Sequence, residues 1–319
     1  MSHCPITYES CEEKRYSASG LKKFSRRLDT IHDFPYSAAE QRAESALRAS
    51  KMSVQGIQPK LSTRLNLQKA CFEITDKGGR YLIKPQHDVY PELPENEDLC
   101  MRLAAVVGIT VPLHALIYCK DHTFSYVIKR FDREGRSDKL ATEDFAQLAN
   151  MDRNTKYDFS MERLIPILDM CTFPAIERVR FFRRCIFNYL IGNEDMHLKN
   201  FSLITKGNKI ELAPAYDFLS TTTAFMSLGK PLDQIEEVAL SLKGRKRKLT
   251  RNIWINYFAK DRLQLNSAVI AEEFTRFSTS LDQWYDLINI SFLSPTGKDI
   301  LIDLVKRRRQ LLIPCAFNH

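Results

Sequence analysis

The chain has 319 residues, with a hydrophobic fraction of 44% and a charged fraction of 27%, which is the composition of an ordinary globular protein. No apolar run reaches the roughly eighteen residues of a membrane-spanning helix, and polar residues interrupt the start, where a cleavable signal would lie. We therefore expect no membrane partner and a cytoplasmic location, with specialised secretion into another cell left open. The eight scattered cysteines lack a C-x-x-C pair and give no zinc or redox signature.

The formal net charge of +8 is concentrated in two basic stretches, residues 243–251 and 306–309. Such stretches can bind phosphate backbones or an acidic partner. However, the chain has no zinc finger, no RNP-like aromatic motif and no clear basic helix-turn-helix with which to read bases. We expect 306–309 to be a solvated helix face and 243–251 to be an exposed loop, for which an acidic or nucleic-acid-bearing partner stays open. Contact of the chain with nucleic acid is expected to be at most indirect.

Hydrophobic patterning divides the chain into a strand-rich and a helical part. After a helical pattern at 38–49, alternation predicts strands at 61–67, 70–75 and 80–84, a helix at 95–107, and strands at 114–118 and 124–130. Further helices are predicted at 162–170, 175–191, 280–288 and 298–312. This order indicates an α+β fold of two lobes, a small antiparallel β-rich lobe at 1–133 and a mainly helical lobe at 134–319.

Two charged residues flank the connection between the third predicted strand and the first long helix. Lys84 ends the strand, where kinases place the lysine that contacts the nucleotide phosphates. Glu97 opens the helix, where its carboxylate could pair with Lys84 and fix its direction. The structural alternatives are a surface-strand lysine and, for Glu97, a helix-start acid favoured by the macrodipole.

The most informative segment is 193–200, which reads Asn-Glu-Asp-Met-His-Leu-Lys-Asn and is followed by Asp217 before an aromatic residue. In protein kinases a catalytic-loop Asp accepts the substrate hydroxyl proton, and an Asn and a later Asp hold magnesium. Asp195, Asn200 and Asp217 reproduce that order and spacing. Magnesium prefers oxygen ligands such as those of Asn200 and Asp217, which leaves Asp195 off the metal as the base. Each residue alone fits a polar loop, but the full set predicts an ATP- and Mg²⁺-dependent phosphotransferase.

These residues resemble the HipA-type serine/threonine kinases, the toxins of bacterial toxin–antitoxin operons. The four blocks that carry the resemblance follow in order along the chain: Gly56-x-Gln58-Pro59-Lys60, Arg130-Phe131-Asp132-Arg133, residues 193–202, and Tyr216-Asp217. The resemblance implies a two-lobed, protein-kinase-like fold. The chain departs from ordinary protein kinases in placing His197 two residues after Asp195 and Lys199 four residues after it.

The resemblance also implies how the nucleotide would be held. The Lys129 carbonyl and the Phe131 amide would face the adenine edge, and Asp132 the ribose hydroxyls. A salt bridge of Asp132 with a neighbouring arginine is the structural alternative. Residues assigned to the ATP site on the same ground are Gly56, His197 and Lys199.

The segment 53–60 would cover the nucleotide phosphates, although it is poor in glycine. In the family this loop carries a serine that the enzyme itself phosphorylates, and the added charge can expel the loop and silence the enzyme. Ser53 is the matching position. Some relatives have a second serine where this chain has Gln55, so two-site regulation is not expected.

The short start of the chain indicates its place in the family. HipA chains carry a small subdomain before the phosphate-covering loop, whereas 52 residues precede Ser53 here. The chain therefore resembles the shorter HipT kinase of three-gene HipBST systems. This implies a small HipS-like antitoxin and a DNA-binding HipB-like protein as partners. The family further implies an aminoacyl-tRNA synthetase as substrate, and hence a toxin that inhibits translation.

Two other functions are open from the sequence. An aminoglycoside-type small-molecule phosphotransferase uses a similar Asp and Asn loop, but such enzymes lack the Gln58-Pro59-Lys60 segment. A non-catalytic regulatory module of a DNA-binding complex has no need of the full set Lys84, Asp195, Asn200 and Asp217.

Overall fold

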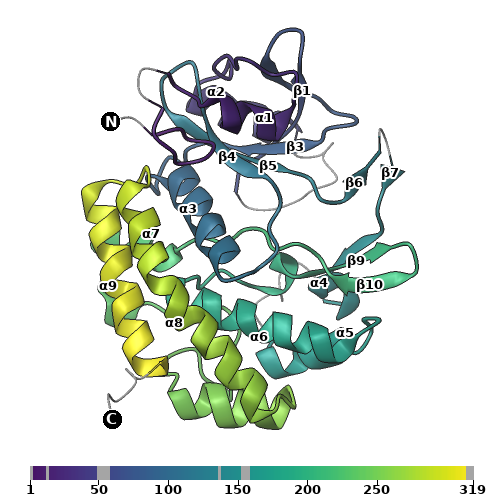
Figure 1. Ribbon diagram of the computed structural model, residues 1–319, viewed down its shortest axis with the longest axis vertical. Helices are drawn as coiled ribbons and strands as arrows, with labels where there is room; N and C mark the ends of the chain where they lie inside the picture. The colour runs from purple at the N-terminus through teal and green to yellow at the C-terminus, as the bar shows by residue number, and fades with distance from the viewer. Residues whose placement is uncertain (1–2, 12–13, 49–57, 136–137, 152–158, 314–319) are drawn as a thin grey trace.

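The computed structural model describes residues 3–11, 14–48, 58–135, 138–151 and 159–313 (Figure 1). Five strands in the first half form one antiparallel sheet in the order β2-β1-β3-β5-β4. Their bounds are β1 Leu61–Asn66, β2 Cys71–Ile74, β3 Tyr81–Lys84, β4 His114–Tyr118 and β5 Phe124–Lys129. Each predicted strand of this sheet is confirmed, with small shifts at the ends.

The sheet separates two hydrophobic cores. Leu116 and Tyr126 belong to the core shared with the helical half, whereas their chain neighbours Ile117 and Val127 belong to a second core on the other face. Successive side chains of a strand point to opposite faces, so this arrangement requires apolar residues at consecutive positions. The central strands are therefore buried on both sides.

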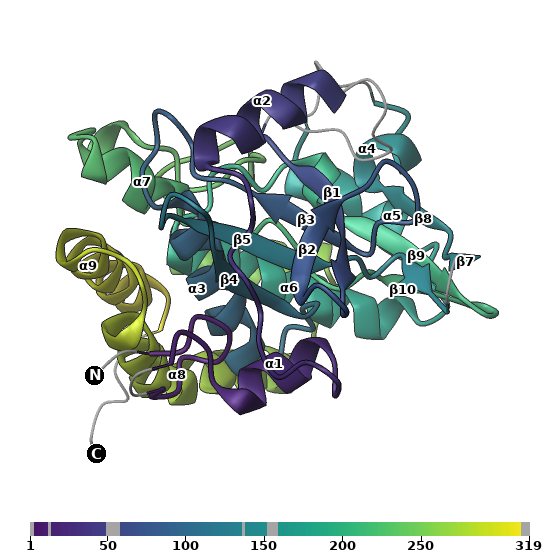
Figure 2. The same cartoon turned by 90° about the horizontal axis from the view of Figure 1, so that it is seen from above.

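The segment before the sheet covers its outer face. Helices α1, Ala18–Phe24, and α2, Ala38–Arg48, belong to this cover, and Figure 2 shows them on opposite sides of the strands. Phe34, between the two helices, is buried in the outer core with strand residues. The predicted helix at 38–49 is confirmed as α2, and α1 was not predicted.

Helix α3, Leu93–Val106, lies on the inner face of the sheet and connects it to the helical half. Leu99 and Leu103 are fully buried in a core that also contains residues of the C-terminal helices. Trp284 donates its Nε1–H to the carbonyl oxygen of Leu103 at 3.0 Å. Because this core runs through both halves, the lobe boundary between residues 133 and 134 stays a prediction.

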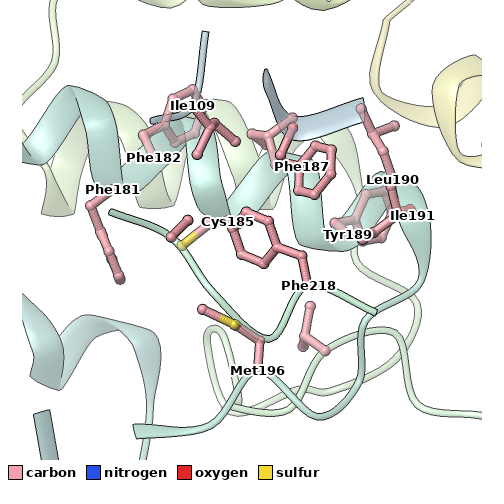
Figure 3. Packing of buried hydrophobic residues seen from close by; sticks show 14 of the residues in the cluster. Ile109, Phe181, Phe182, Cys185, Phe187, Tyr189, Leu190, Ile191, Met196 and Phe218 are labelled. Atoms are coloured by element: carbon pink, nitrogen blue, oxygen red, sulfur yellow. The ribbon is translucent and has the colours of Figure 1, made fainter. Parts of the chain in front are cut away.

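The second half is mainly helical, as predicted. Its α-helices are α4 Phe145–Leu148, α5 Ile165–Leu168, α6 Pro174–Ile191, α7 Thr221–Ser227, α8 Ser267–Ile290 and α9 Pro295–Leu312. The 3₁₀ segments are Met161–Leu164, Leu198–Asn200 and Leu232–Gln234, and η4, Ile253–Arg262, is a π-helix. Figure 3 shows buried apolar residues of α6 and their neighbours, and the ring centroids of Phe187 and Phe218 are 4.9 Å apart. Among the described residues, no helix is both long and apolar enough to cross a membrane.

The extent of two predicted helices was wrong. The helix predicted at 280–288 is the end of α8, whose buried residues Ile270, Phe277 and Leu281 continue the helical period through polar neighbours. The helix predicted at 162–170 is a 3₁₀ segment followed by the four-residue α5. Pro166 lies in the first turn of α5, where its lack of an N–H group prevents one continuous helix.

Strands in the second half were not predicted. β8 Thr142–Asp144, β9 Ser202–Lys206 and β10 Lys209–Leu212 form a three-stranded antiparallel sheet, and β6 Arg133–Glu134 pairs with β7 Asp138–Lys139. The 306–309 stretch is also not a wholly solvated face, since Arg308 is buried and donates to the carbonyl oxygen of Tyr189. The last carbonyls of a helix lack partners within it, and the guanidinium provides one.

Candidate active site

A cavity of about 600 Å³ lies between the five-stranded sheet and the helical half. The predicted site residues that line it are Lys84, Glu97, Lys129, Phe131, Asp132, Asp195, His197, Lys199, Asn200 and Asp217. These come from β3, α3, the end of β5 and the loops around β9 and β10, so the fold brings together residues that are far apart in sequence. The remaining two predicted positions, Ser53 and Gly56, lie outside the described residues.

A buried ion-pair network forms the back of the cavity. The Lys84 Nζ lies 2.6 Å from the Glu97 Oε1 and 2.5 Å from the Asp217 Oδ1. Lys84 and Glu97 are 2% and 1% exposed, so both charges are removed from water and need each other. This burial does not match the structural alternatives, which were a surface lysine for Lys84 and a solvent-facing acid at the helix start for Glu97.

The network sets the charge of its members. Burial alone would lower the pKa of Lys84, but Asp217 and Glu97 outweigh it and raise the pKa above its ordinary value. Burial would likewise raise the pKa of Asp217, but Lys84 and Lys60 hold it below its ordinary value. Lys84 is therefore an ammonium and Asp217 a carboxylate at neutral pH.

The backbone at Asp217 is held in an unusual conformation. Its φ is +56°, in the left-handed region that few residues other than Gly, Asn and Asp adopt. Asn193 donates from its Nδ2 to the Asp217 carbonyl oxygen at 3.4 Å and to the Asn188 Oδ1 at 2.9 Å. Residues in this region are often found at functional sites, and the Asp217 carboxylate contacts Lys84 from this conformation.

The loop at 193–200 begins where α6 ends in a left-handed glycine. Gly192 has a φ of +78°, and a Cβ added there would lie 2.6 Å from the side chain of Leu304 and 2.7 Å from that of Thr222. The Asn193 side chain then accepts from the backbone N–H of Asp195 at 3.1 Å. Glycine at the helix end and asparagine after it therefore direct the chain into the cavity.

Asp195 presents the most exposed carboxylate of this loop, with its side chain 51% exposed. The Nε2 of buried His197 lies 3.9 Å from the Asp195 Oδ1. Asn200 donates from its Nδ2 to the Asp195 carbonyl oxygen at 3.0 Å, which leaves its amide oxygen as the atom that could bind a cation. The loop thus offers a solvent-accessible carboxylate next to a fixed amide.

The segment after β5 lines the outer part of the cavity. The ring of Phe131 stacks on that of Tyr216, with ring centroids 5.5 Å apart and planes at 28°. Asp132 accepts from the Arg130 guanidinium at 2.7 and 2.9 Å and lies 3.2 Å from Arg133. Burial would raise the pKa of Asp132, but the arginines hold it below its ordinary value. The salt bridge between Asp132 and a neighbouring arginine, which the sequence left open as an alternative, is therefore present.

Three residues that line the cavity had no individual role predicted from the sequence. Lys60 is 9% exposed and lines the cavity, and burial lowers its pKa. Tyr216 donates to the Lys199 carbonyl oxygen at 2.9 Å and stacks on Phe131, and Asn193 holds the loop. Lys60, Asn193 and Tyr216 stand inside the sequence blocks that indicated the site, and this position is the signal that could have found them.

The oxygen ligands available in the cavity suit Mg²⁺, which also binds phosphates and water. They do not suit a metal ion that is held by protein side chains alone. No group of three or more His, Cys, Asp and Glu side chains in the described part of the chain could hold a metal ion. Asn200 and Asp217 offer two oxygen ligands in one cavity. Mg²⁺ is usually bound by one or two carboxylates together with substrate phosphates and water, so these two residues suffice for it.

Comparisons with known sequences connect the chain to one family. A family model described as HipA-like C-terminal domain matches residues 52–284. A Haemophilus influenzae protein named as a candidate kinase is 32% identical over 239 residues, which cover 70% of this chain and 69% of that protein. The serine/threonine-protein kinase toxin HipA of Shewanella oneidensis is 27% identical over 190 residues, which cover 53% of this chain and 43% of the toxin. Apart from the Haemophilus protein, the chain spans about half the length of the curated relatives it matches.

Solved structures agree on the fold. Shewanella oneidensis HipA, in a complex with HipB and its operator DNA, matches with a TM-score of 0.67 and 20% identity, covering 89% of this chain and 72% of HipA. The Helicobacter pylori proinflammatory kinase CtkA matches with a TM-score of 0.52 and 16% identity, covering 73% of this chain and 85% of the kinase. The two-lobed, kinase-like α+β fold predicted from the sequence is confirmed.

Proposed function

Because the chain belongs to the family of HipA-like C-terminal domains, we propose that it is an ATP-dependent serine/threonine protein kinase. One observation carries the proposal: Lys84, Glu97 and Asp217 form a buried network in the same cavity that Asp195 and Asn200 line. A kinase needs this combination, because phosphoryl transfer depends on positioning and on neutralising the charge of the phosphates.

Each residue of the cavity has a role in the proposal. The Asp195 carboxylate accepts the proton of the attacking hydroxyl, for which its exposure suits it. The Lys84 ammonium, held by Glu97, contacts the nucleotide phosphates. Asn200 and Asp217 would hold Mg²⁺, which neutralises charge on the phosphates when it is bound. His197 and Lys199 line the same cavity and are proposed to contact ATP.

The adenine end of ATP is proposed to lie against the segment after β5. The backbone carbonyl of Lys129 and the amide of Phe131 would pair with the adenine edge. The Phe131–Tyr216 stack provides a flat apolar wall for a base. Asp132 would contact the ribose by exchanging part of its salt bridge with Arg130.

The regulation and partners of the kinase are proposals from the family. Ser53 is proposed to be autophosphorylated, and Gly56 to belong to the loop that covers the phosphates. HipA of Shewanella oneidensis was solved with HipB and operator DNA, which supports a HipB-like DNA-binding partner for this chain. A small HipS-like antitoxin and an aminoacyl-tRNA synthetase substrate complete the proposed toxin–antitoxin function.

The test is phosphoryl transfer from labelled ATP with magnesium, to the protein itself and to aminoacyl-tRNA synthetases. Asp195→Ala is expected to lower the rate at least about 100-fold, because the general base is lost. Asp286→Ala, on the exposed side of α8, is the matched control and should keep the wild-type rate. Peptide mass analysis would locate any label at Ser53.

Two outcomes would contradict the proposal. The first is no transfer by wild-type protein shown to be unphosphorylated at the start. The second is equal transfer by the wild type and Asp195→Ala. Label on a small alcohol such as an aminoglycoside, without label on any protein, would favour the small-molecule phosphotransferase.

A further inference from the structure

A second cavity, of about 110 Å³, lies in the helical half and shares no lining residue with the active-site cavity. It lies between α6, the β9–β10 hairpin and the turn that follows α3. Arg180, Arg183, Arg184 and Lys206 line it, with Glu211 as the carboxylate among the lining residues. Cations therefore dominate its walls.

Arg184 is the unusual member of this cavity. It is 4% exposed, and its Nη2 donates to the carbonyl oxygen of Ala213 at 2.6 Å. Among the described residues no carboxylate lies within ion-pair distance of its guanidinium. Burial lowers the pKa of Arg184 to about 10, although Glu177 opposes the shift. A buried cation without a counter-ion is costly, and an arginine keeps its charge in proteins, so an external anion would stabilise it.

The neighbouring cations are paired. The guanidinium of Arg183 donates to both carboxylate oxygens of Glu273 at 2.7 Å and to the Gly108 carbonyl oxygen at 3.0 Å. Three of its five N–H donors are therefore occupied, which fixes the position of this positive charge in the cavity wall. This pairing contrasts with that of Arg184, one residue later in α6.

The rim of the cavity is more loosely held. Arg180 donates to Glu177 at 2.8 Å, and the Lys206 Nζ lies 3.3 Å from Glu211. Both cations are close to half exposed, with side chains 44% and 48% accessible. Exposed pairs of this kind are weak, so Arg180 and Lys206 can turn toward an anion in the cavity at small cost.

The anion is best matched by a phosphate dianion. A guanidinium binds phosphate through two parallel N–H···O bonds, and cations on α6 and β9 approach the cavity from different sides. The four cations that line the cavity outnumber the three carboxylates that pair with them, Glu177, Glu211 and Glu273, so the net charge around the cavity is positive. A ligand of two negative charges is therefore attracted more strongly than a monoanionic carboxylate. We propose that this cavity binds a phosphate dianion, either as free phosphate or as the phosphoryl group of a phosphorylated side chain.

Inorganic phosphate is the first probe, measured by calorimetry and by thermal unfolding of the purified full chain. We expect Arg184→Met to weaken phosphate binding about tenfold or more, because a charge-assisted bidentate contact is lost. Lys206→Gln, at the exposed rim, should weaken it severalfold without risk to folding. Arg178→Met is the matched control, since Arg178 is on α6 but pairs with Asp169 away from the cavity.

The active-site cavity could also bind phosphate, and Lys84→Met separates the two sites. Binding that persists in Lys84→Met and is lost in Arg184→Met belongs to the second cavity. Equal binding by the wild type, Arg184→Met and Lys206→Gln would overturn the proposal, as would a preference for acetate over phosphate. A phosphoserine peptide bound at least about tenfold more tightly than phosphate would identify a phosphorylated side chain as the source, and equal affinity would identify the free ion.

Discussion

Lys84 and Arg184 are both almost fully buried cations, and they differ in what their own chain provides for them. Lys84 lies within 2.6 Å of Glu97 and Asp217, whereas among the described residues the guanidinium of Arg184 has one hydrogen bond, to the Ala213 carbonyl oxygen, and no carboxylate at ion-pair distance. The first cation is neutralised before any ligand arrives, so its position does not depend on the nucleotide. The second has no carboxylate in direct contact and only the more distant buried Glu177 to offset its charge, so an external anion in the cavity would stabilise it further. Burial alone therefore does not reveal a cation's role, and its partners do.

Removal of Lys84, the paired cation, is expected to have the largest effect. Lys84→Met should lower kcat/KM for phosphoryl transfer about 100- to 1,000-fold, because a charge aimed at the transferred group is lost. The measurement is initial rate against ATP concentration. Lys260→Met, exposed on η4, controls for loss of a lysine as such. Wild-type kinetics in Lys84→Met would show that the buried network does not serve the reaction.

Removing the carboxylate instead of the cation tests the pairing itself. Glu97→Gln should lower the free energy of unfolding by about 3 kcal/mol, because breaking a buried ion pair leaves a charge uncompensated. Asp217 still contacts Lys84, which keeps the cost at the lower end of the usual range. Urea denaturation is the measurement, with exposed Glu143→Gln as the control. A change no larger than that of the control would mean that Asp217 alone neutralises Lys84.

Glu95, on α3 two residues before Glu97, is a second buried carboxyl, and its partner is a neutral amide instead of an ammonium. Gln86 donates to both of its carboxylate oxygens at 2.8 Å, yet burial raises the pKa of Glu95 from 4.5 to about 7. Burial raises the pKa of Glu97 to about 7 as well, although Lys84 opposes that shift. A carboxyl with a raised pKa in the folded state loses its contribution to stability as pH rises from 4.5 through 7.

The difference in unfolding free energy between wild type and Glu95→Gln should therefore fall by about 2 kcal/mol from pH 5 to pH 8. Urea denaturation of the wild type and of Glu95→Gln at each pH is the measurement. A flat difference for Glu95→Gln would show that the Gln86 amide is enough to keep this carboxylate ionised.

Local patterns predicted the first half of the fold, and they pointed to residues that the structure brings together in one cavity. The strands of the first sheet follow from alternation and turn residues, which are read within a few positions. Asp195, Asn200 and Asp217 could be found because their spacing is short and their chemistry is specific. The family resemblance added Lys129 and Phe131, which line the same cavity, although only the proposed experiments test their roles.

Other features depend on contacts between distant residues. The β9–β10 hairpin had a local signal in the sequence, because Gly207 and Asn208 form a two-residue turn that places Lys206 opposite Lys209. The hairpin was missed because this half of the chain was interpreted as mainly helical. The missing counter-ion of Arg184 has no local signal at all. Whether Arg184 lies near a carboxylate depends on the packing of α6 against β10 and on the turn that follows α3, which no periodicity in its own segment reveals.

The hydrogen bond from Trp284 to the Leu103 carbonyl oxygen couples the unfolding of α3 to that of α8. One side of α3 carries Glu97, which lines the active-site cavity, and the other side packs against the C-terminal helices. A residue range such as 1–133, cut out alone, would expose Leu99 and Leu103 to water. The two lobes should therefore unfold as one cooperative unit, and the residues of the active-site cavity should separate in the same transition that unfolds the helices.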